Sequence, residues 1–286
     1  MKIEIKDNFK FGRTGNISCR LLIESDKLKE TIEYIKKEKV RSIELNFYHG
    51  YLLKDINFIS EVADILEDIS IVTDDINLKH IEELKNLKNI FVGGENKSHI
   101  DFSHFKYLES CNISWHKDLK NLSSCKHLND LTLRKYTYNN KTSHFITGLN
   151  QLKSLCFIQS KFEDLEMLKL FPNLETLEIY YNRWLVNIEV LSNCKQTLTR
   201  LILDHCKNVN DYKVLEQLTE LKFLNVTDSK PLPNLKFIKQ LKNLEHFSFT
   251  GTDILDGDLT PCFGIKHVGF FDKKHYSHKS ADFAKL

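Results

Sequence analysis

A pair of histidines near the end of the chain is the first feature that could do chemistry. His275 and His278 stand three residues apart, flanked by Lys273, Lys274 and Lys279. Histidine nitrogens ligate zinc, and clustered cations attract phosphate. Two histidines without further ligands at a recognisable spacing define neither site, and a solvated basic tail is the simpler interpretation. We therefore predict no metal site and no cofactor.

Seven cysteines at irregular spacings are the next candidates. They could form a disulfide or metal framework, or they could be buried thiols in a reducing compartment. The second interpretation is favoured because four of them fall where other copies of a repeat, described below, hold leucine, isoleucine or phenylalanine: Cys111, Cys125, Cys194 and Cys262. The cysteines thus predict a cytoplasmic protein.

Short motifs that position catalytic groups or phosphates are missing from the sequence. It contains no G-x-G-x-x-G, G-x-x-x-x-G-K-[ST], H-E-x-x-H or G-x-S-x-G. Gly93-Gly94 follows a predicted strand, where a turn with positive φ explains the glycines. None of the twelve histidines stands at a recognisable spacing from a cysteine and an aspartate that would form a nucleophile and a base. We predict that the chain is not an enzyme.

The elements that would position any functional side chain repeat along most of the chain. An apolar residue recurs every 20 to 26 residues, with a second apolar residue two positions later and a third three positions earlier. The spacing of two predicts a strand whose alternate side chains enter one core. The first residue of each pair is here called the anchor. The anchors are Ile43, Ile69, Ile90, Cys111, Leu131, Leu155, Leu177, Leu201, Leu224, Phe247 and Val268.

This pattern resembles the leucine-rich repeat family in its short cytosolic form, whose unit runs L-x-x-L-x-L-x-x-N/C-x-L. Leu174, Leu177, Ile179 and Asn182 fit that unit, and the resemblance covers about residues 40–271. It implies an α/β fold: a right-handed solenoid, or horseshoe, with a parallel sheet on the concave face and short helical or 3₁₀ returns on the convex face. It also implies a protein-binding role.

The asparagine position, five residues after the anchor, departs from the family pattern in most copies. Asn182 and Cys206 fit it. A hydroxyl there can still bond the backbone of the turn, whereas a larger side chain predicts irregular structure around residues 93–140. The other residues at this position are Glu95, His116, Tyr136, Ser160, Ser229, Thr252 and Lys273.

Both ends of the chain fall outside the repeat. Residues 1–39 predict a cap of strands near residue 4 and over residues 17–23, followed by a helix. Residues 40–271 form the array of about eleven repeats. Residues 272–286 predict a tail that covers the last repeat, because the end of a solenoid exposes its core. Tyr276 or Phe283 would pack there.

Helical elements are predicted from apolar spacing and capping residues. Between strands, apolar residues three apart, such as Leu165 and Leu168, predict 3₁₀ or helical returns. The longest interval between anchors predicts an α-helix over residues 56–66. In the cap, Asp26 is a plausible N-cap for a helix from Lys27 to about Lys39.

Strand alternation also predicts which side chains a partner could reach. Residues one and three positions after each anchor point out of the sheet, and the residues just beyond them form its rim. Tryptophan, tyrosine and arginine dominate many protein interfaces, and they gather between residues 115 and 205. For Trp184 the sequence leaves exposure and burial equally open. We predict a contact surface of Trp115, Arg134, Tyr136, Glu178, Tyr180, Tyr181, Asp204 and His205.

Composition narrows the function further. A net charge of +2 gives no long-range field to recruit nucleic acid, and no run of about 18 apolar residues or signal-like stretch directs the chain to a membrane. We predict a cytoplasmic, non-catalytic interaction module or scaffold that binds a folded protein on its concave face, with no small-molecule substrate. One alternative is an inhibitor or immunity-type protein that neutralises a specific enzyme or toxin. Another, suggested by the resemblance, is a phosphatase-regulator-like adaptor.

Overall fold

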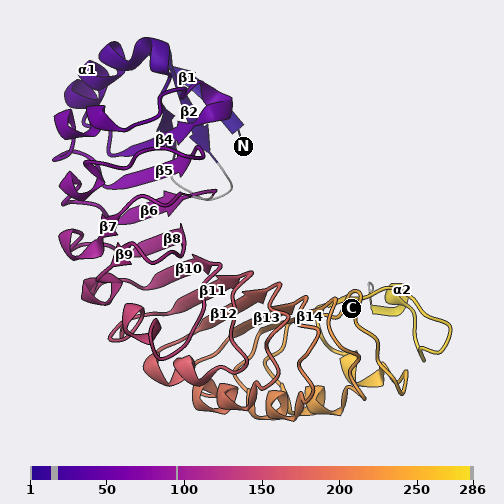
Figure 1. The fold of residues 1–286 in the computed structure, drawn as a ribbon. Helices are drawn as coiled ribbons and strands as arrows, with labels where there is room; N and C mark the ends of the chain where they lie inside the picture. The colour runs from indigo at the N-terminus through magenta and orange to yellow at the C-terminus, as the bar shows by residue number, and fades with distance from the viewer. Residues whose placement is uncertain (1, 14–18, 95, 284–286) are drawn as a thin grey trace. The chain divides into compact units, whose positions relative to one another are not determined.

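Parallel strands stacked in register are the main feature of the computed structural model, which describes residues 2–13, 19–94 and 96–283 (Figure 1). The chain divides into a first unit, Met1–Leu131 with His144–Leu149, and a second unit, Thr132–Ser143 with Asn150–Leu286. None of the helices in the described residues is long and apolar enough to cross a membrane.

The first unit holds a sheet in the order β1-β2-β3-β4-β5-β6-β8. Its strands are β1 (Lys2–Lys6), β2 (Phe9–Arg13), β3 (Arg20–Leu22), β4 (Ser42–Asn46), β5 (Asp68–Val72), β6 (Asn89–Val92) and β8 (Ser110–Ser114), with a separate pair β7 (Ile100–Asp101) and β9 (Leu119–Lys120). Its helices are α1 (Leu28–Glu38) and the 3₁₀ segments η1 (Ser25–Lys27), η2 (Phe47–His49), η3 (Asn57–Glu61), η4 (Ile81–Glu83), η5 (Phe102–His104) and η6 (Leu122–Ser124).

The second unit holds parallel strands in the order β11-β12-β13-β14-β15-β16, with a row of 3₁₀ helices along its lower side in Figure 1. The strands are β11 (Ser154–Ile158), β12 (Thr176–Tyr180), β13 (Arg200–Asp204), β14 (Phe223–Thr227), β15 (His246–Ser248) and β16 (His267–Gly269). The helices are η8 (Glu166–Leu170), η9 (Glu189–Cys194), η10 (Lys213–Gln217), η11 (Lys236–Gln240), η12 (Thr260–Cys262) and α2 (Ser280–Phe283). The boundary between the units falls within β10 (Asp130–Arg134) and η7 (Ser143–Phe145).

The predicted register is confirmed within each unit. In the second, Leu177 pairs with Leu155 on one side and with Leu201 on the other. The same alignment relates the anchors Ile43, Ile69, Ile90 and Cys111 of the first unit. All anchors are buried except Val268, which is half-buried. Burying each such side chain contributes about 1.5–3 kcal/mol, and it requires a neighbouring repeat on both sides.

The parallel register starts one strand earlier than the sequence indicated. Leu21 of β3 pairs in parallel with Ile43, so β3 aligns with the strands of the array. The antiparallel partner β2, which the sequence did not predict, joins β3 to β1. Residues 17 and 18 of the predicted second strand lie outside the described residues. The antiparallel β1–β2 hairpin is therefore the part that departs from the repeat.

The cap helix is confirmed as α1, but its predicted N-cap is wrong. Asp26 lies inside η1, and α1 starts after Lys27 without a side-chain capping bond. The helix ends where Lys39 adopts a left-handed conformation with φ 54°. Ile32 and Ile35 are buried beneath it, so packing rather than capping fixes this helix.

Short 3₁₀ returns are confirmed, as in η8, where Leu165 and Leu168 are buried. The predicted α-helix over residues 56–66 is wrong: the segment contains only η3 followed by turns. Ile56, Ile59 and Val62 are buried at a spacing of three, which suits the three residues per turn of a 3₁₀ helix. Phe58, Ala63 and Leu66 are buried as well.

The tail covers the last repeat, and both predicted aromatic residues pack there. The backbone amide of Ile254 donates to the hydroxyl of Tyr276 over 3.2 Å. Phe283 is 3% exposed, and its ring centroid lies 5.0 Å from that of Phe263. Nε2 of His275 lies 3.0 Å from the carbonyl oxygen of Ile254, and Lys273 forms an ion pair with Asp253. These contacts make the basic tail a structural cover.

The asparagine position of the repeat is buried in the copies from Tyr136 to Thr252, whereas His116 and Lys273 are half-buried. Asn182 is fully buried: its amide donates to the carbonyl of Phe162 over 3.2 Å, and its Oδ1 accepts from the backbone amides of Trp184 and Leu185. In the first unit Asn96 makes equivalent bonds, donating to the carbonyl of Ile76. It stands one residue after Glu95, which the repeat alignment assigned to this position and which lies outside the described residues.

Replacing Asn182 by alanine should lower the free energy of unfolding by about 2–4 kcal/mol, because the backbone amides of Trp184 and Leu185 and the carbonyl of Phe162 lose their partner. Urea denaturation measures this change. Asn173→Ala is the control, since Asn173 is exposed and makes a single bond, to the carbonyl of Asn150. Equal losses in the two variants would contradict the structural role given to Asn182.

Candidate functional site

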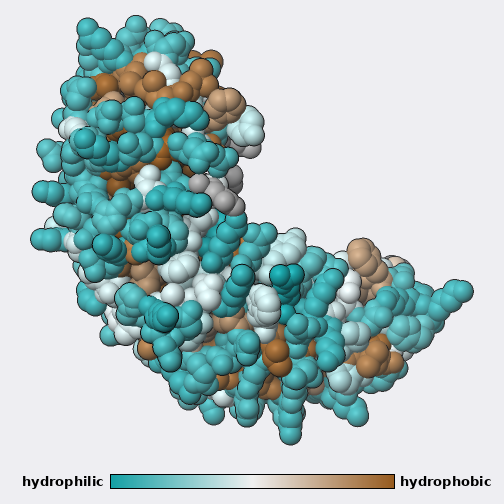
Figure 2. Space-filling view, viewed as in Figure 1, coloured by the Kyte–Doolittle hydropathy of each residue, from teal (hydrophilic) through white to brown (hydrophobic). Residues whose placement is uncertain are grey.

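The open face of the second unit's sheet, opposite the buried anchors, presents three side chains from a full strand. They come from the residue before the anchor and from the residues one and three positions after it, because alternate side chains point to opposite faces. On β12 these are Thr176, Glu178 and Tyr180, all half-buried by their neighbours. Most of the second unit's visible surface is hydrophilic in Figure 2.

A charged and aromatic row crosses four neighbouring strands of this face. Nε of Arg200 donates to Glu178 over 2.7 Å, and its guanidinium carbon lies 3.8 Å from the ring centroid of Phe223. Phe223 in turn stacks on His246 with 4.1 Å between centroids and 4° between planes. Each contact joins residues of adjacent strands, so the register fixes the whole row. We call Glu178, Arg200, Phe223 and His246 the cross-strand row.

A second group lies where the strands end. Nδ1 of His205 lies 2.5 Å from Oδ1 of Asp204 and donates to it, because a carboxylate can only accept. Thr227 donates to the other oxygen of Asp204 over 2.7 Å. The ring of Tyr181 packs against that of His205 with centroids 4.4 Å apart, and Asp228 lies 4.0 Å from Nδ1 of His205. We call these five residues the strand-end cluster.

The backbone explains why the strand-end cluster projects from the sheet. Tyr181, His205 and Asp228 each follow a strand and have positive φ values of 58°, 53° and 45°. Each amide still donates to the next repeat, for example from Tyr181 to the carbonyl of Asp204 over 2.9 Å. The left-handed conformation turns the chain away from the sheet directly after that bond. It is unfavourable for a non-glycine residue by about 1–2 kcal/mol, so the stacked backbone must hold it.

The strand-end cluster also contains a set of atoms suited to a divalent cation. Asp204, His205 and Asp228 each offer one oxygen or nitrogen, all within 4.8 Å of one another. Oxygen and imidazole ligands suit zinc and similar ions. The bonds from His205 and Thr227 to Asp204 already account for the geometry, so the cluster needs no ion to explain it.

Two open-face groups have displaced pKa values. Burial, assisted by the nearby His267 and Arg200, lowers the pKa of His246 below its ordinary value of 6.5. Burial and the adjacent carboxylate of Glu178 raise the pKa of Tyr180, whose hydroxyl donates to that carboxylate over 3.1 Å. His246 therefore tends to stay neutral, and Tyr180 remains a hydrogen-bond donor.

Five of the eight sequence-predicted contact residues lie together. Glu178 and Tyr180 are hydrogen-bonded, and Tyr181, Asp204 and His205 adjoin them through β12 and β13. Arg134 is half-buried at the end of β10. Trp115 is half-buried in the first unit, whereas the other seven residues belong to the second.

Tyr136 is a correction to the predicted surface: it is fully buried. Its hydroxyl donates to the carbonyl of Thr142 over 2.8 Å, and its ring stacks on Phe157. The physical reason is its place in the repeat, five residues after the anchor, where Asn182 is buried as well. Burial raises its pKa to about 12. Tyr136 stabilises the turn and cannot contact a partner there.

Sequence reasoning missed the residues immediately before the anchors. Arg200, Phe223 and His246 hold this position in β13, β14 and β15. The sequence did contain the signal for these three residues: strand alternation places them on the same face as the residues one and three positions after the anchor. Trp184, for which the sequence left both outcomes open, is 43% exposed.

In-register parallel strands, three buried apolar positions per repeat and 3₁₀ returns define a leucine-rich-repeat solenoid. Solved leucine-rich-repeat structures are similar to this chain in fold. An internalin (inlF) from Listeria monocytogenes str. 4b F2365 is similar with a TM-score of 0.59 and 17% identity, covering 94% of this chain and 84% of that one. A TLR13–ssRNA13 complex is similar with a TM-score of 0.54 and 16% identity, covering 90% and 43%. Such likeness shows the fold alone.

Sequence comparison agrees with this class. No family model matches the chain. An acidic leucine-rich nuclear phosphoprotein 32-related protein from Plasmodium falciparum (isolate 3D7) is 26% identical over 157 residues. That match covers 50% of this chain and 56% of the relative, so it spans little more than half of the relative's length.

His246 should make the protein less stable in acid. Because its pKa is lowered in the folded state, the unfolded chain takes up the proton first as the pH falls below 6.5, and the free energy of unfolding decreases. His246→Phe keeps the stacking on Phe223 and removes the titration. Urea denaturation at about pH 7 and about pH 5 should show a smaller loss for this variant than for the wild type.

The exposed His127 supplies the control. His127→Asn should retain the wild-type loss of stability between the two pH values. If His246→Phe loses as much stability between the two pH values as the wild type does, the pKa of His246 is not lowered by its surroundings.

Proposed function

We propose that this chain is a non-catalytic binding module that holds a folded protein partner on the open face of the second unit's sheet. The observation that carries the proposal is the cross-strand row, in which Arg200 bridges Glu178 and Phe223 and a histidine completes the stack. Arginine and aromatic side chains dominate many protein interfaces. These side chains are held before binding, which reduces the entropy lost on association.

The chemistry of the strand-end cluster supports the non-catalytic part. Asp204 and His205 are paired like an orienting acid and a base. A covalent mechanism would also need a nucleophile bonded to that base. The hydroxyl of Thr227 donates to Asp204 instead of to the imidazole. The pair therefore serves better as a polar contact than as a catalytic centre.

The charge of the open face favours a protein over nucleic acid. Glu178, Asp204 and Asp228 place carboxylates on or beside it, and they would repel a phosphate backbone. The TLR13 neighbour is in complex with ssRNA, so the fold by itself does not decide between the two partners. The arrangement of side chains in this chain supports the protein.

A cytoplasmic location is part of the proposal. Five of the seven cysteines are buried in the core. Burial raises the pKa of Cys206 and Cys262 to about 12, which keeps these thiols unreactive. Thiols that fill a core without crosslinking it suit a reducing compartment. A stable scaffold of this kind needs neither a cofactor nor a membrane.

Photo-crosslinking tests the proposal. Benzoylphenylalanine in place of Phe223 should capture one protein in native extract, whereas the same group at Lys236, exposed on η11, should not. With the captured protein purified, Arg200→Ala should weaken binding about tenfold or more in calorimetry, and Lys236→Ala should leave it unchanged. Equal capture at both positions, or full affinity of Arg200→Ala, would contradict the open-face proposal.

The captured partner also separates the finer possibilities. If it is an enzyme or toxin whose activity falls on stoichiometric binding, the chain is an inhibitor or immunity-type protein. If it is a phosphatase whose substrate choice changes, the chain is an adaptor. If the partner's activity does not change on binding, the chain is a scaffold.

A further inference from the structure

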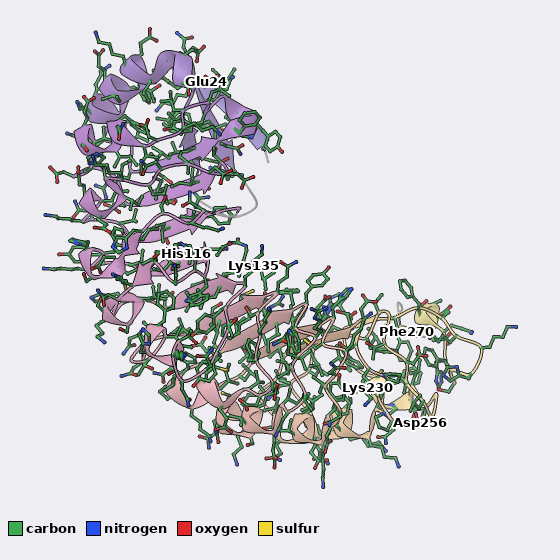
Figure 3. All side chains as sticks on the ribbon, in the orientation of Figure 1. Glu24, His116, Lys135, Lys230, Asp256 and Phe270 are labelled. Carbon is green, nitrogen blue, oxygen red and sulfur yellow. The ribbon has the colours of Figure 1, made fainter. Side chains whose placement is uncertain are left out.

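A second charged surface lies along the turns that follow the strands of the second unit, away from the open face. Four cations occupy the same place in four successive repeats, six residues after the anchors Leu155, Leu177, Leu201 and Leu224. All four side chains are exposed. We call them the cation ladder: Lys161, Arg183, Lys207 and Lys230, the last of which is labelled in Figure 3.

The buried turn position explains why these cations line up. Each directly follows a buried residue that is bonded into its turn: Ser160, Asn182, Cys206 and Ser229. The turns are also bonded to one another, as where the amide of Cys206 donates to Ser229 over 3.3 Å. Because one residue is fixed inward, the next is exposed at the same height in each repeat. The cation ladder is thus a consequence of the fold, not of flexible side chains meeting by chance.

The cation ladder carries uncompensated charge. None of the ion pairs formed within residues 2–13, 19–94 and 96–283 includes any of its four members, although neighbours such as Lys153 and Lys273 are paired. Thr137 precedes the ladder at the same repeat position, and Asp253 follows it. The positive row therefore has defined ends.

A groove of about 440 Å³ runs beside three of the cations and has aromatic walls. It is lined by Lys161, Arg183 and Lys207 together with Tyr181, Trp184 and His205. Tyr181 is 53% exposed and Trp184 43% exposed, and the guanidinium of Arg183 lies 5.3 Å from the indole centroid. The groove offers cations for acidic groups and flat apolar surface for what lies between them.

The charge changes sign across Trp184. That indole also lines a neighbouring groove of about 690 Å³, where Lys161 is outnumbered by the three carboxylates of Glu163, Asp164 and Glu166. An anionic ligand would therefore be attracted to one side of the indole and repelled from the other. The tryptophan is placed by its backbone amide, which donates to the buried Asn182 over 2.9 Å.

We propose that the cation ladder binds an extended acidic segment of a polypeptide. Strands of a sheet lie about 4.8 Å apart, so the four cations span roughly 14 Å. Alternate side chains of an extended chain lie about 6.7 Å apart, so three alternate carboxylates span about 13 Å and match that length. A nucleic acid would extend past the ladder's ends, where Thr137 and the Lys273-paired Asp253 add no positive charge and a net charge of +2 gives no further attraction.

The four cations of this site are not part of the cross-strand row that carries the open-face proposal, although Tyr181 and His205 of the strand-end cluster line the groove beside them. An acidic segment could belong to the same partner or to another protein. The two proposals can fail separately, since charge reversal of the cation ladder leaves Arg200, Phe223 and His246 unchanged.

The test uses the full chain and a short fluorescein-labelled peptide of alternating glutamate and serine. Fluorescence anisotropy should show binding that weakens as salt is added, since exposed charge contacts are screened. The variant Lys161→Glu, Arg183→Glu, Lys207→Glu should bind about tenfold or more weakly. Its thermal unfolding must match the wild type; otherwise the corresponding glutamine substitutions replace it.

A matched control reverses three exposed lysines on η10 and η11, Lys213, Lys236 and Lys239, and so changes the net charge equally. This control should bind within about twofold of the wild type if position rather than total charge matters. In a Trp115→Phe background Trp184 is the remaining tryptophan, and its emission should shift on peptide binding. Equal loss in both charge-reversed variants, or an unchanged Trp184 signal, would overturn the proposal. So would binding of a charge-matched oligouridine in preference to the peptide.

Discussion

The parallel backbone pairing between consecutive repeats is the interaction on which the rest of the structure depends. Each strand uses its amides and carbonyls on both neighbours, and the pairing continues one residue beyond the strand, from the amide of Tyr181 to Asp204 and from His205 to Thr227. That last bond fixes the point at which the chain turns. This turn then places one residue inward and the next outward in successive repeats of the second unit. A small set of backbone bonds therefore determines the core, the open face and the exposed turns together.

The two candidate surfaces follow from how side chains vary on this fixed frame. On the open face, adjacent strands supply groups that complement one another, such as Glu178 with Arg200 and Phe223 with His246. Along the turns, adjacent repeats supply like charges, which repel one another and remain unpaired. Complementary neighbours give a rigid, nearly neutral surface suited to a folded partner. Like neighbours give a field that only a ligand of opposite charge can neutralise.

Much of this could be predicted from spacing. Residues equivalent to Leu177 and Ile179 recur every 20 to 26 residues, always two positions apart, so the core and the strand register were accessible from sequence, as was the outward direction of Glu178 and Tyr180. The repeat pattern also held the information that Tyr136 occupies the buried asparagine position, but its aromatic side chain suggested an interface. Position in the repeat, not residue type, decided its burial. The single-residue offset that brings Asn96 into the turn depends on local backbone geometry, which periodicity does not encode.

The cross-strand row was less accessible because its contacts join residues 22 or 23 positions apart in sequence. Their side-chain types, Arg200 and Phe223 among them, give no motif along the chain. They become a site only when the register places them on adjacent strands. The same holds for the cation ladder, whose members stand singly in sequence. In a repeat protein the core can thus be predicted from the spacing of apolar residues, whereas the candidate binding surfaces leave no motif along the chain.

Amide hydrogen exchange measured by NMR tests this dependence on backbone pairing most directly. The amides of Tyr181, His205 and Asp228 lie in left-handed turn residues that ordinary loops would expose to solvent. If they pair with the next repeat, they should exchange as slowly as amides within β12 and β13. Exchange as fast as that of exposed turn residues such as Lys207 would contradict the account, because neither surface would then be held in place by the repeat.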